Sequence, residues 1–247
     1  MKISGNTILV TGGGSGIGRA LAQRWHDLGN HVIVAGRRQD ALNETIAGRA
    51  NMAAMTLDVE SVEAIEDFAT RLITAHPALN VIVNNAGIMA REDLTARRDL
   101  SVAEATIVTN LLGPIRLIDA LVDHLAAAPD AVIVNLSSGL GFVPLPGAPT
   151  YSATKAAIHS YTVSLREQLK GKIEVIELAP PAVRTDLTPG QSTREGYMPL
   201  DEFADEVMGL FQQVPTPPEI LVKNVLPLRT AEAEGRFPDV LAFLNNL

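Results

Sequence analysis

The chain has 247 residues, 47% of them hydrophobic, which suits a single α/β domain over 1–247 with a sizeable core. Its 20 basic and 28 acidic residues leave a net charge of −8 without any basic run, so we expect no nucleic-acid partner. The absence of cysteine excludes disulfides and thiolate chemistry, and the five histidines lack metal-ligand spacing, so no metal site is expected.

The amino terminus, MKISGNTILV, enters an apolar run directly and lacks the basic and hydrophobic segments of a signal sequence. No later apolar stretch approaches the ~20 residues of a membrane span. We therefore expect a soluble cytoplasmic protein without a membrane partner.

Short β-rich apolar runs alternate with segments of helical periodicity. This alternation predicts a Rossmann-like, doubly wound parallel sheet with helices on both faces. A capping box formed by Ser101 and Glu104 predicts a long helix to about Leu125, and a second should run from about Thr150 to Leu169. The strands are expected at 7–10, 31–35, 52–56, 80–84, 131–136, 172–178 and 219–222.

The first strand leads directly into a glycine-dense turn, TGGGSGIG, and then an amphipathic helix. Glycine lets a backbone approach a pyrophosphate closely, and a helix amino terminus offers free N–H groups to it. The spacing differs from the common G-x-G-x-x-G pattern, and a tight turn without a ligand is the alternative. We expect phosphate contacts from Thr11, Gly12, Gly14, Ser15, Gly16, Ile17 and Gly18.

Further motifs follow the glycine turn: NNAG at 84–87, Asn110, Ser138 and YSATK at 151–155. In their order and separations they resemble the classical short-chain dehydrogenases/reductases, over roughly residues 5–186. The resemblance implies that Asp58 and Val59 contact adenine, although a helix-cap role for Asp58 is an equal alternative. The other cofactor contacts that it implies are Asn85, Ala86, Gly87, Pro180, Val183 and Thr185.

The residue that ends the second strand lies beside the adenosine ribose in dinucleotide folds, where a carboxylate would repel a 2′-phosphate. Gly36 stands there, followed by Arg37 and Arg38, whose guanidinium groups can bind phosphate oxygens. This favours NADP(H), with NAD(H) still possible. The alternative is a solvated loop.

Tyr151 and Lys155 are four residues apart on a predicted helix and therefore share one face. A nearby ammonium should lower the phenol pKa from its usual value of about 10. Tyr151 could then give a proton to a carbonyl oxygen as hydride arrives, or take it back. The resemblance implies that Lys155 also binds the nicotinamide ribose. The alternative is an ordinary exposed Tyr and Lys.

Ser138 ends the fifth strand, where open α/β sheets place their sites, and its hydroxyl could orient the substrate carbonyl. Ser137 should point the other way. If both are only turn residues, neither has this role.

Asn110 lies four residues before Pro114, which has no N–H for the Asn110 carbonyl, so the helix should kink there. The resemblance implies that this Asn holds a water that links the Lys to solvent. A simple packing kink aided by Gly113 is the alternative.

The chain departs from the family pattern at Pro181, where a glycine is usual, which puts the placement of Val183 and Thr185 in question. The usual glycine-rich ending after the last strand is also missing, so a tetramer interface is uncertain. A polar segment at about 186–213 is expected as a substrate flap, with an ordinary surface loop as the alternative. The candidate pocket residues, which favour a fairly hydrophobic substrate, are Met89, Leu140, Phe142, Leu187, Tyr197 and Met198.

Together these patterns predict an NADP(H)-dependent oxidoreductase that interconverts a ketone or aldehyde and the alcohol. The alternatives are an NAD(H)-preferring alcohol dehydrogenase and a cofactor-binding sensor or interaction protein without turnover. The small residues Ala153, Ala156 and Ala157 favour a homodimer through the long helices, unless they pack inside the monomer.

Overall fold

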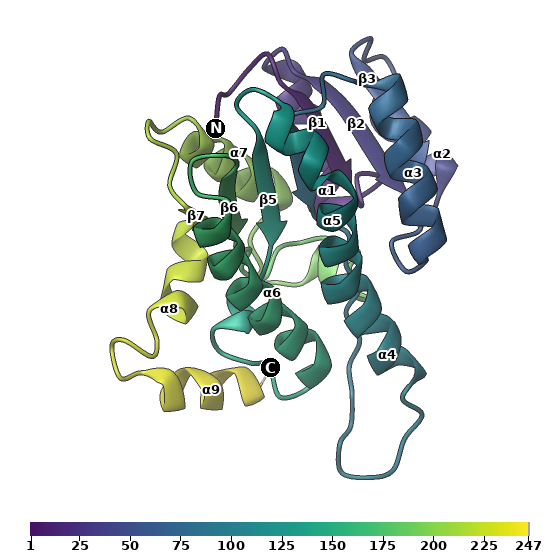
Figure 1. The fold of residues 1–247 in the computed structure, drawn as a ribbon. Coiled ribbons are helices and arrows are strands. Elements are labelled where there is room, and N and C mark those ends of the chain that lie inside the picture. Colours follow the sequence, from purple (N-terminus) through teal and green to yellow (C-terminus); the bar gives the residue numbers. More distant parts are fainter. Residues whose placement is uncertain (247) are drawn as a thin grey trace.

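The computed structural model describes residues 1–246 and contains one fully parallel sheet (Figure 1). Its strands are β1 Thr7–Thr11, β2 His31–Gly36, β3 Met52–Thr56, β4 Val81–Asn84, β5 Val132–Leu136, β6 Glu174–Leu178 and β7 Glu219–Ile220. The strand order β3-β2-β1-β4-β5-β6-β7 is that of a doubly wound sheet, so the predicted fold class is confirmed. Every predicted run forms a strand, although β7 has only two residues.

Helices pack on both faces of this sheet. The helices of the described residues are α1 Gly16–Asp27, α2 Gln39–Ile46, α3 Val62–Ala75, α4 Ser101–Ile107, α5 Gly113–Ala127, α6 Pro149–Gln168, α7 Leu200–Phe211, α8 Leu226–Arg229 and α9 Phe237–Asn245, of which α9 lies away from the sheet faces (Figure 1). Successive residues of a strand point to opposite faces, so each strand contributes to two cores. In β1, Ile8 packs in the core with Trp25 of α1, whereas Leu9 packs in the core with Phe68 of α3.

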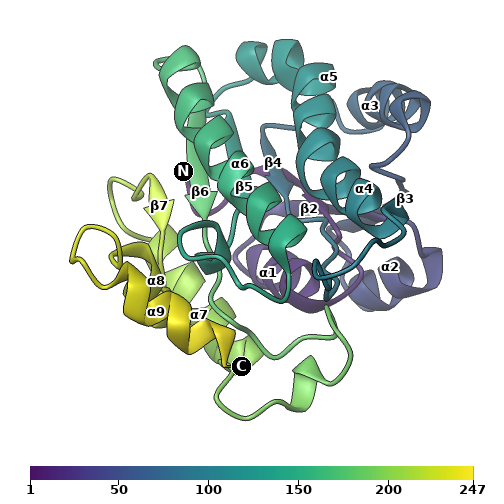
Figure 2. The ribbon, with the colours of Figure 1, turned by 90° about the horizontal axis from the view of Figure 1, so that it is seen from below.

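The order of the strands reverses at β1. The first part of the chain adds β2 and β3 on one side of β1, and the remainder adds β4 to β7 on the other side. The loops after β1 and β4 therefore diverge, which leaves a crevice at the carboxyl edge where such sheets bind ligands. Figure 2 looks at this edge from below.

The predicted long helix is interrupted before Pro114. It consists of α4, a π-helical turn at Val108–Leu112, and α5. The irregularity expected at Asn110 is thus present as a π turn, because proline offers no N–H to the preceding turn.

The capping box predicted for this helix is wrong. Asp99 accepts hydrogen bonds from both the backbone N–H and the hydroxyl of Ser101, at 2.9 and 2.8 Å, so the cap comes from the preceding loop. Neither Ser101 nor Glu104 caps the helix with its side chain.

The prediction that no stretch is long enough for a membrane span is wrong for Ser101–Ala127. An 18-residue window within it has a mean hydropathy of 1.4, so by length and composition it could cross a membrane. However, Leu117, Leu121 and Leu125 of α5 are buried in the core on the α3 side of the sheet. The apolar face of this helix is therefore used in packing against the sheet.

The region predicted as a flap divides into two parts. Residues 200–211 form α7, whose Phe203 and Phe211 are buried, so the flap prediction is wrong there. Residues 186–199 are irregular, with one short helical turn at Gln191–Thr193. Only this part can cover a site at the carboxyl edge.

Candidate active site

The glycine turn between β1 and α1 leaves no room for side chains. Gly12 has a φ of +65°, and a Cβ there would lie 2.9 Å from the Ala86 Cα. A Cβ on Gly18 would lie 2.4 Å from the carbonyl oxygen of Gly12. The turn is therefore packed backbone against backbone at the start of α1, where free N–H groups can hold a phosphate.

Thr11 and Asn85 lock this turn to the loop after β4. The Thr11 hydroxyl accepts the backbone N–H groups of Asn85 and Ala86 at 3.0 and 3.1 Å. In return, the Asn85 side-chain amide donates to the Thr11 carbonyl at 2.7 Å. Thr11 therefore acts behind the turn and does not face the crevice.

The crevice at the carboxyl edge is a hollow of about 440 Å³. A larger hollow of about 750 Å³ lies at the other end of β5 and β6, and none of the motif residues lines it. The predicted residues that the first hollow brings together are Gly12, Ser15, Gly16, Ile17, Gly18, Asn85, Ala86, Gly87, Ser138, Tyr151, Lys155, Pro180, Val183 and Thr185. Pro181 lines it too, so the departure from the usual glycine leaves Val183 and Thr185 facing the crevice.

Tyr151, Lys155 and Ser138 are all buried at the floor of this hollow, with 8%, 5% and 7% of their surfaces exposed. The Lys155 Nζ donates to the Leu136 carbonyl at 2.8 Å and lies 5.6 Å from the centre of the Tyr151 ring. The Ser138 hydroxyl accepts the Leu140 backbone N–H at 3.1 Å. Ser137 also lines the hollow, but its hydroxyl donates to the buried carboxylate of Glu177.

The ionisation of this pair differs from the expectation. Burial raises the pKa of Tyr151 to about 12, and an interaction with the Ser138 side chain only partly opposes the rise. Burial also lowers the pKa of Lys155 to about 8. Desolvation thus determines the direction of the shift for the phenol, and Tyr151 is a protonated acid at neutral pH.

Asn110 lies outside the hollow and clips two elements together. Its side-chain oxygen accepts the Ile88 N–H at 2.9 Å, and its amide donates to the Ile88 carbonyl at 2.8 Å. The same amide reaches the Thr154 hydroxyl of α6 at 3.3 Å. This side chain therefore holds the loop after β4 against the helix that carries Tyr151.

The two arginines after β2 point to different places. Arg37 pairs with Glu60 at 3.2 Å and lines a side hollow with Asp58. Arg38 lines another hollow, together with Gly14 and Ser15 of the glycine turn. Arg38 is therefore the arginine on the side of the turn.

Of the two predicted adenine contacts, Asp58 lines the side hollow with Arg37, whereas Val59 packs against the core. Asp58 accepts the Glu60 N–H at 3.0 Å, and the α3 cap is supplied by Ser61, which accepts the Ala64 N–H at 3.1 Å. Asp58 is thus not the helix cap. Val59 packs against the core on the α3 and α5 side, and with Thr11 and Ala86 it lines a small space apart from the hollow of Tyr151.

Three of the six predicted apolar pocket residues lie at the hollow or beside Tyr151, and three lie elsewhere. Met89 and Leu187 line the hollow, and Leu140 packs in the cluster that contains Tyr151. The prediction is wrong for three residues, which have other contacts: Phe142 packs against His159, Met198 lies in the main core, and Tyr197 lies under Arg194.

Sequence reasoning missed Glu92, which anchors the start of α6. Its carboxylate accepts the Thr150 backbone N–H at 2.9 Å and the Thr150 hydroxyl at 2.8 Å, and it pairs with Arg98 at 2.5 Å. Burial alone would raise the pKa of Glu92, but these bonds outweigh it and lower the pKa. No local pattern could have found this anchor, because its two halves are 58 residues apart.

Gln191, in the irregular part of the flap, was missed as well. Its amide donates to the Val183 carbonyl at 2.8 Å and to the Thr185 hydroxyl at 3.1 Å. The flap is thereby tied to the wall of the hollow.

Comparisons with known proteins agree with this geometry. The model of the short chain dehydrogenase family matches residues 6–196. The uncharacterized oxidoreductase DltE of Bacillus subtilis is 40% identical over 79% of each chain, and sulfoacetaldehyde reductase 2 of Chromohalobacter salexigens is 33% identical over 73% of this chain and 74% of its own. The chain therefore belongs to the short-chain dehydrogenase/reductase family of oxidoreductases.

Solved structures share the whole fold. A short chain dehydrogenase from Burkholderia cenocepacia in complex with NADP has a TM-score of 0.85 at 23% identity, and 99% of each chain is covered. The closed form of serine dehydrogenase complexed with NADP+ has a TM-score of 0.77 at 26% identity, covering 87% of this chain and 92% of its own. The first of these likenesses extends over the carboxyl-terminal helices as well.

Proposed function

We propose that the protein is an NADP(H)-dependent oxidoreductase that interconverts a ketone or aldehyde and the corresponding alcohol, with Tyr151 as the acid/base. The observation that carries the proposal is that Ser138, Tyr151 and Lys155 are buried together in the hollow that the glycine turn also lines. The sulfoacetaldehyde reductase among the relatives is named for reduction of an aldehyde, which agrees in reaction class.

The residues present fit a nicotinamide dinucleotide. Gly12, Ser15, Gly16 and Gly18 of the glycine turn line the same hollow as Tyr151, and Gly12 and Gly18 pack so closely against protein atoms that neither could carry a side chain. Thr185 lies 3.5 Å from the place of a Cβ on Gly16, so the wall after β6 closes on the same turn. The dinucleotide, when bound, supplies the hydride.

The protein's own contribution is a proton at a fixed place. Tyr151 is protonated at neutral pH because burial raises its pKa to about 12, so it can donate to a carbonyl oxygen that gains negative charge. The Ser138 hydroxyl, next to it, orients that oxygen. Lys155, with its pKa lowered to about 8, is charged at neutral pH and stabilises the phenolate that forms.

The preference for NADP(H) rests on Arg38 more than on Arg37. Arg38 borders Ser15 and Gly14, whereas Arg37 is already paired with Glu60. The same hollow also contains the carboxylates of Asp40, Glu44 and Asp186, of which Glu44 pairs with Arg19. The guanidinium of Arg38 therefore has to outweigh nearby negative charge.

A fluorescence titration with NADPH and NADH tests this preference. We expect at least roughly tenfold tighter binding of NADPH, or about 1.4 kcal/mol. Arg38→Ala should remove most of this difference, and Arg37→Ala should remove less. Equal affinities in the unaltered protein would contradict the preference, and binding of neither would contradict the proposed cofactor altogether.

Turnover tests the reaction itself. Purified protein with NADPH and a panel of aldehydes and ketones should consume NADPH, and Tyr151→Phe should lower the rate by about 10²–10⁴-fold. The apolar walls at Met89, Val183 and Leu187 favour a fairly hydrophobic carbonyl compound. A rate that Tyr151→Phe leaves nearly unchanged would overturn the assignment of the acid.

A homodimer in the cytoplasm is part of the proposal. Ala153 and Ala156 of α6 are exposed, so they do not pack inside the monomer, and Leu100, Val102 and Ile107 beside or on α4 are 41% to 52% exposed. These neighbouring surfaces on α4 and α6 can pair with a second copy. Light scattering should give twice the chain mass, and Ala153→Glu should give the monomer.

A further inference from the structure

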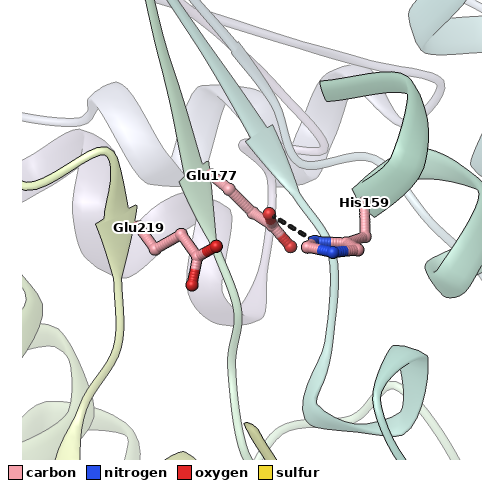
Figure 3. Close-up of side chains that lie close together, drawn as sticks. All are labelled: His159, Glu177 and Glu219. Carbon is pink, nitrogen blue, oxygen red and sulfur yellow. Dashed lines mark hydrogen bonds and ion pairs between the residues drawn. The ribbon is translucent and has the colours of Figure 1, made fainter. Parts of the chain in front are cut away.

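A cluster of charged side chains lies next to the catalytic group, where α6 packs beside β6 and β7. Figure 3 shows its members His159 of α6, Glu177 of β6 and Glu219 of β7, with the two carboxylates on neighbouring strands. Their ligand atoms all lie within 4.8 Å of one another, although the histidine spacing in the sequence gives no sign of it. Glu177 is completely buried.

The cluster carries its own positive charges. Glu177 and Glu219 are paired in the β6–β7 register, a like-charge arrangement that destabilises a sheet unless it is compensated. Arg229 donates to both oxygens of Glu219, at 2.8 and 3.1 Å, and this bond lowers the pKa of Glu219. The Arg229 guanidinium thus supplies the positive charge that a metal ion would otherwise bring to these carboxylates. We therefore do not infer a metal site.

Glu177 differs from Glu219 because its partners lead to the active site. One oxygen accepts the Ser137 hydroxyl, and the other lies 2.7 Å from the His159 Nδ1. Burying a carboxylate is costly, and an apolar side chain would often serve stability as well. The position of these two partners therefore indicates what the carboxylate contributes.

Both partners adjoin catalytic groups. Ser137 stands between Leu136, whose carbonyl holds the Lys155 ammonium, and Ser138. His159 follows Lys155 and Tyr151 at intervals of four residues, so all three lie on one stripe of α6. Glu177 thus joins the end of β5 to the stripe of α6 at a single buried point.

We propose that Glu177 is a positioning residue for the reaction at Tyr151. Through Ser137 and His159 it fixes the end of β5 against α6, and so holds Ser138 and Lys155 in register with the phenol. The proposal rests on the proposed function. It assigns Glu177 no contact with substrate or cofactor.

The test compares variants within the cluster. Glu177→Leu removes both hydrogen bonds. Glu177→Gln keeps the shape: its oxygen can accept from Ser137, and its amide can donate to the His159 Nδ1 once the imidazole proton moves to the half-exposed Nε2. Glu219→Gln is the matched control, because it weakens the Arg229 pair and leaves both bonds of Glu177 in place. Ser137→Ala deletes one hydroxyl and gives the same comparison if Glu177→Leu does not fold.

Three measurements are made on each variant: kcat and KM with a carbonyl substrate, NADPH affinity by fluorescence, and hydrogen–deuterium exchange of peptides covering 136–143 and 151–159. We expect Glu177→Leu and Ser137→Ala to lower kcat at least about tenfold, since a misplacement of about 1 Å can cost on the order of 10² in rate. NADPH affinity should change less than about twofold, and exchange should rise at the end of β5. Glu177→Gln should stay within about threefold of the unaltered kcat, and Glu219→Gln should match it.

Each failure has its own signature. Unchanged exchange in Glu177→Leu and Ser137→Ala would show that Glu177 does not hold the strand end, whatever the activity. Raised exchange with unchanged kcat would overturn the positioning role. An equal loss of kcat in Glu219→Gln would mean that only the stability of the cluster matters. Absence of turnover in the unaltered protein would instead contradict the proposed function, with exchange still reporting on the anchor.

Discussion

The glycine turn after β1 and the catalytic end of β5 lie at the same edge of the sheet, but they are built differently. The turn consists of backbone: at Gly12 and Gly18 no Cβ can be accommodated. The end of β5 is organised by buried side chains from distant segments, in particular Lys155 and Glu177. The first kind of site tolerates no added atom, whereas the second depends on which groups are charged and how they are held.

The largest effect is expected from Tyr151→Phe, which removes a single oxygen from the site at the end of β5. Tyr151→Phe should lower kcat by about 10²–10⁴-fold, the usual contribution of a positioned acid. NADPH affinity should be retained, because the glycine turn is unchanged. Steady-state kinetics and a fluorescence titration check the two halves, and a parallel loss of NADPH binding would show that the two regions are not separable.

Lys155→Met should separate stability from activity. The folded-state pKa of Lys155, about 8, is depressed from 10.5, so the unfolded chain binds the proton more tightly and the buried ammonium destabilises the fold below about pH 8. Removing it should raise the free energy of unfolding at pH 7 by up to about 3 kcal/mol, while turnover is lost.

The pH dependence checks the sign of this effect. The gain should shrink as pH rises from about 8 toward 10.5, where the unfolded chain also loses its proton. Denaturant unfolding at pH 7 and pH 10 measures it. A variant that is less stable at pH 7 would mean that the bond to the Leu136 carbonyl outweighs the cost of desolvation.

Gly18→Ala probes the backbone site with one methyl group. The new Cβ would lie 2.4 Å from the Gly12 oxygen, so the turn must shift, at a cost of about 1–3 kcal/mol in stability and with weaker NADPH binding. Gly209→Ala in α7 is the control, since nothing lies within 4 Å of its Cβ, and it should stabilise the helix by up to about 1 kcal/mol. Equal effects of the two would show that the turn is not tightly packed.

The smallest expected effect concerns the anchor of α6. Glu92→Ala removes both bonds to Thr150 and should cost about 1–2 kcal/mol of stability, as the loss of a helix cap does. Asp93→Ala, next to it, removes only two local bonds, from the backbone N–H and the hydroxyl of Thr95, and should change stability less. Thermal unfolding compares the two variants. Identical midpoints would show that Glu92 does not anchor the start of α6.

Sequence reasoning succeeded where the determinants are local. The strand positions and the pairing of Tyr151 with Lys155 on one face of α6 follow from periodicity. It failed where neighbouring residues compete for one role, since Asp99 accepts the hydrogen bonds at the start of the long helix in place of the expected capping box. It also failed where burial decides, since the pKa of Tyr151 moved opposite to the expectation and burial cannot be read from spacing.

By itself the sequence determined the doubly wound fold and the backbone of the glycine turn, because strand periodicity and the need for glycine are properties of neighbouring residues. Only the tertiary structure decided which groups are buried, which arginine borders the turn, and that Glu177 meets Ser137 and His159. The physical reason is that desolvation and hydrogen bonding depend on what surrounds a side chain, and those surroundings come from segments tens of residues away.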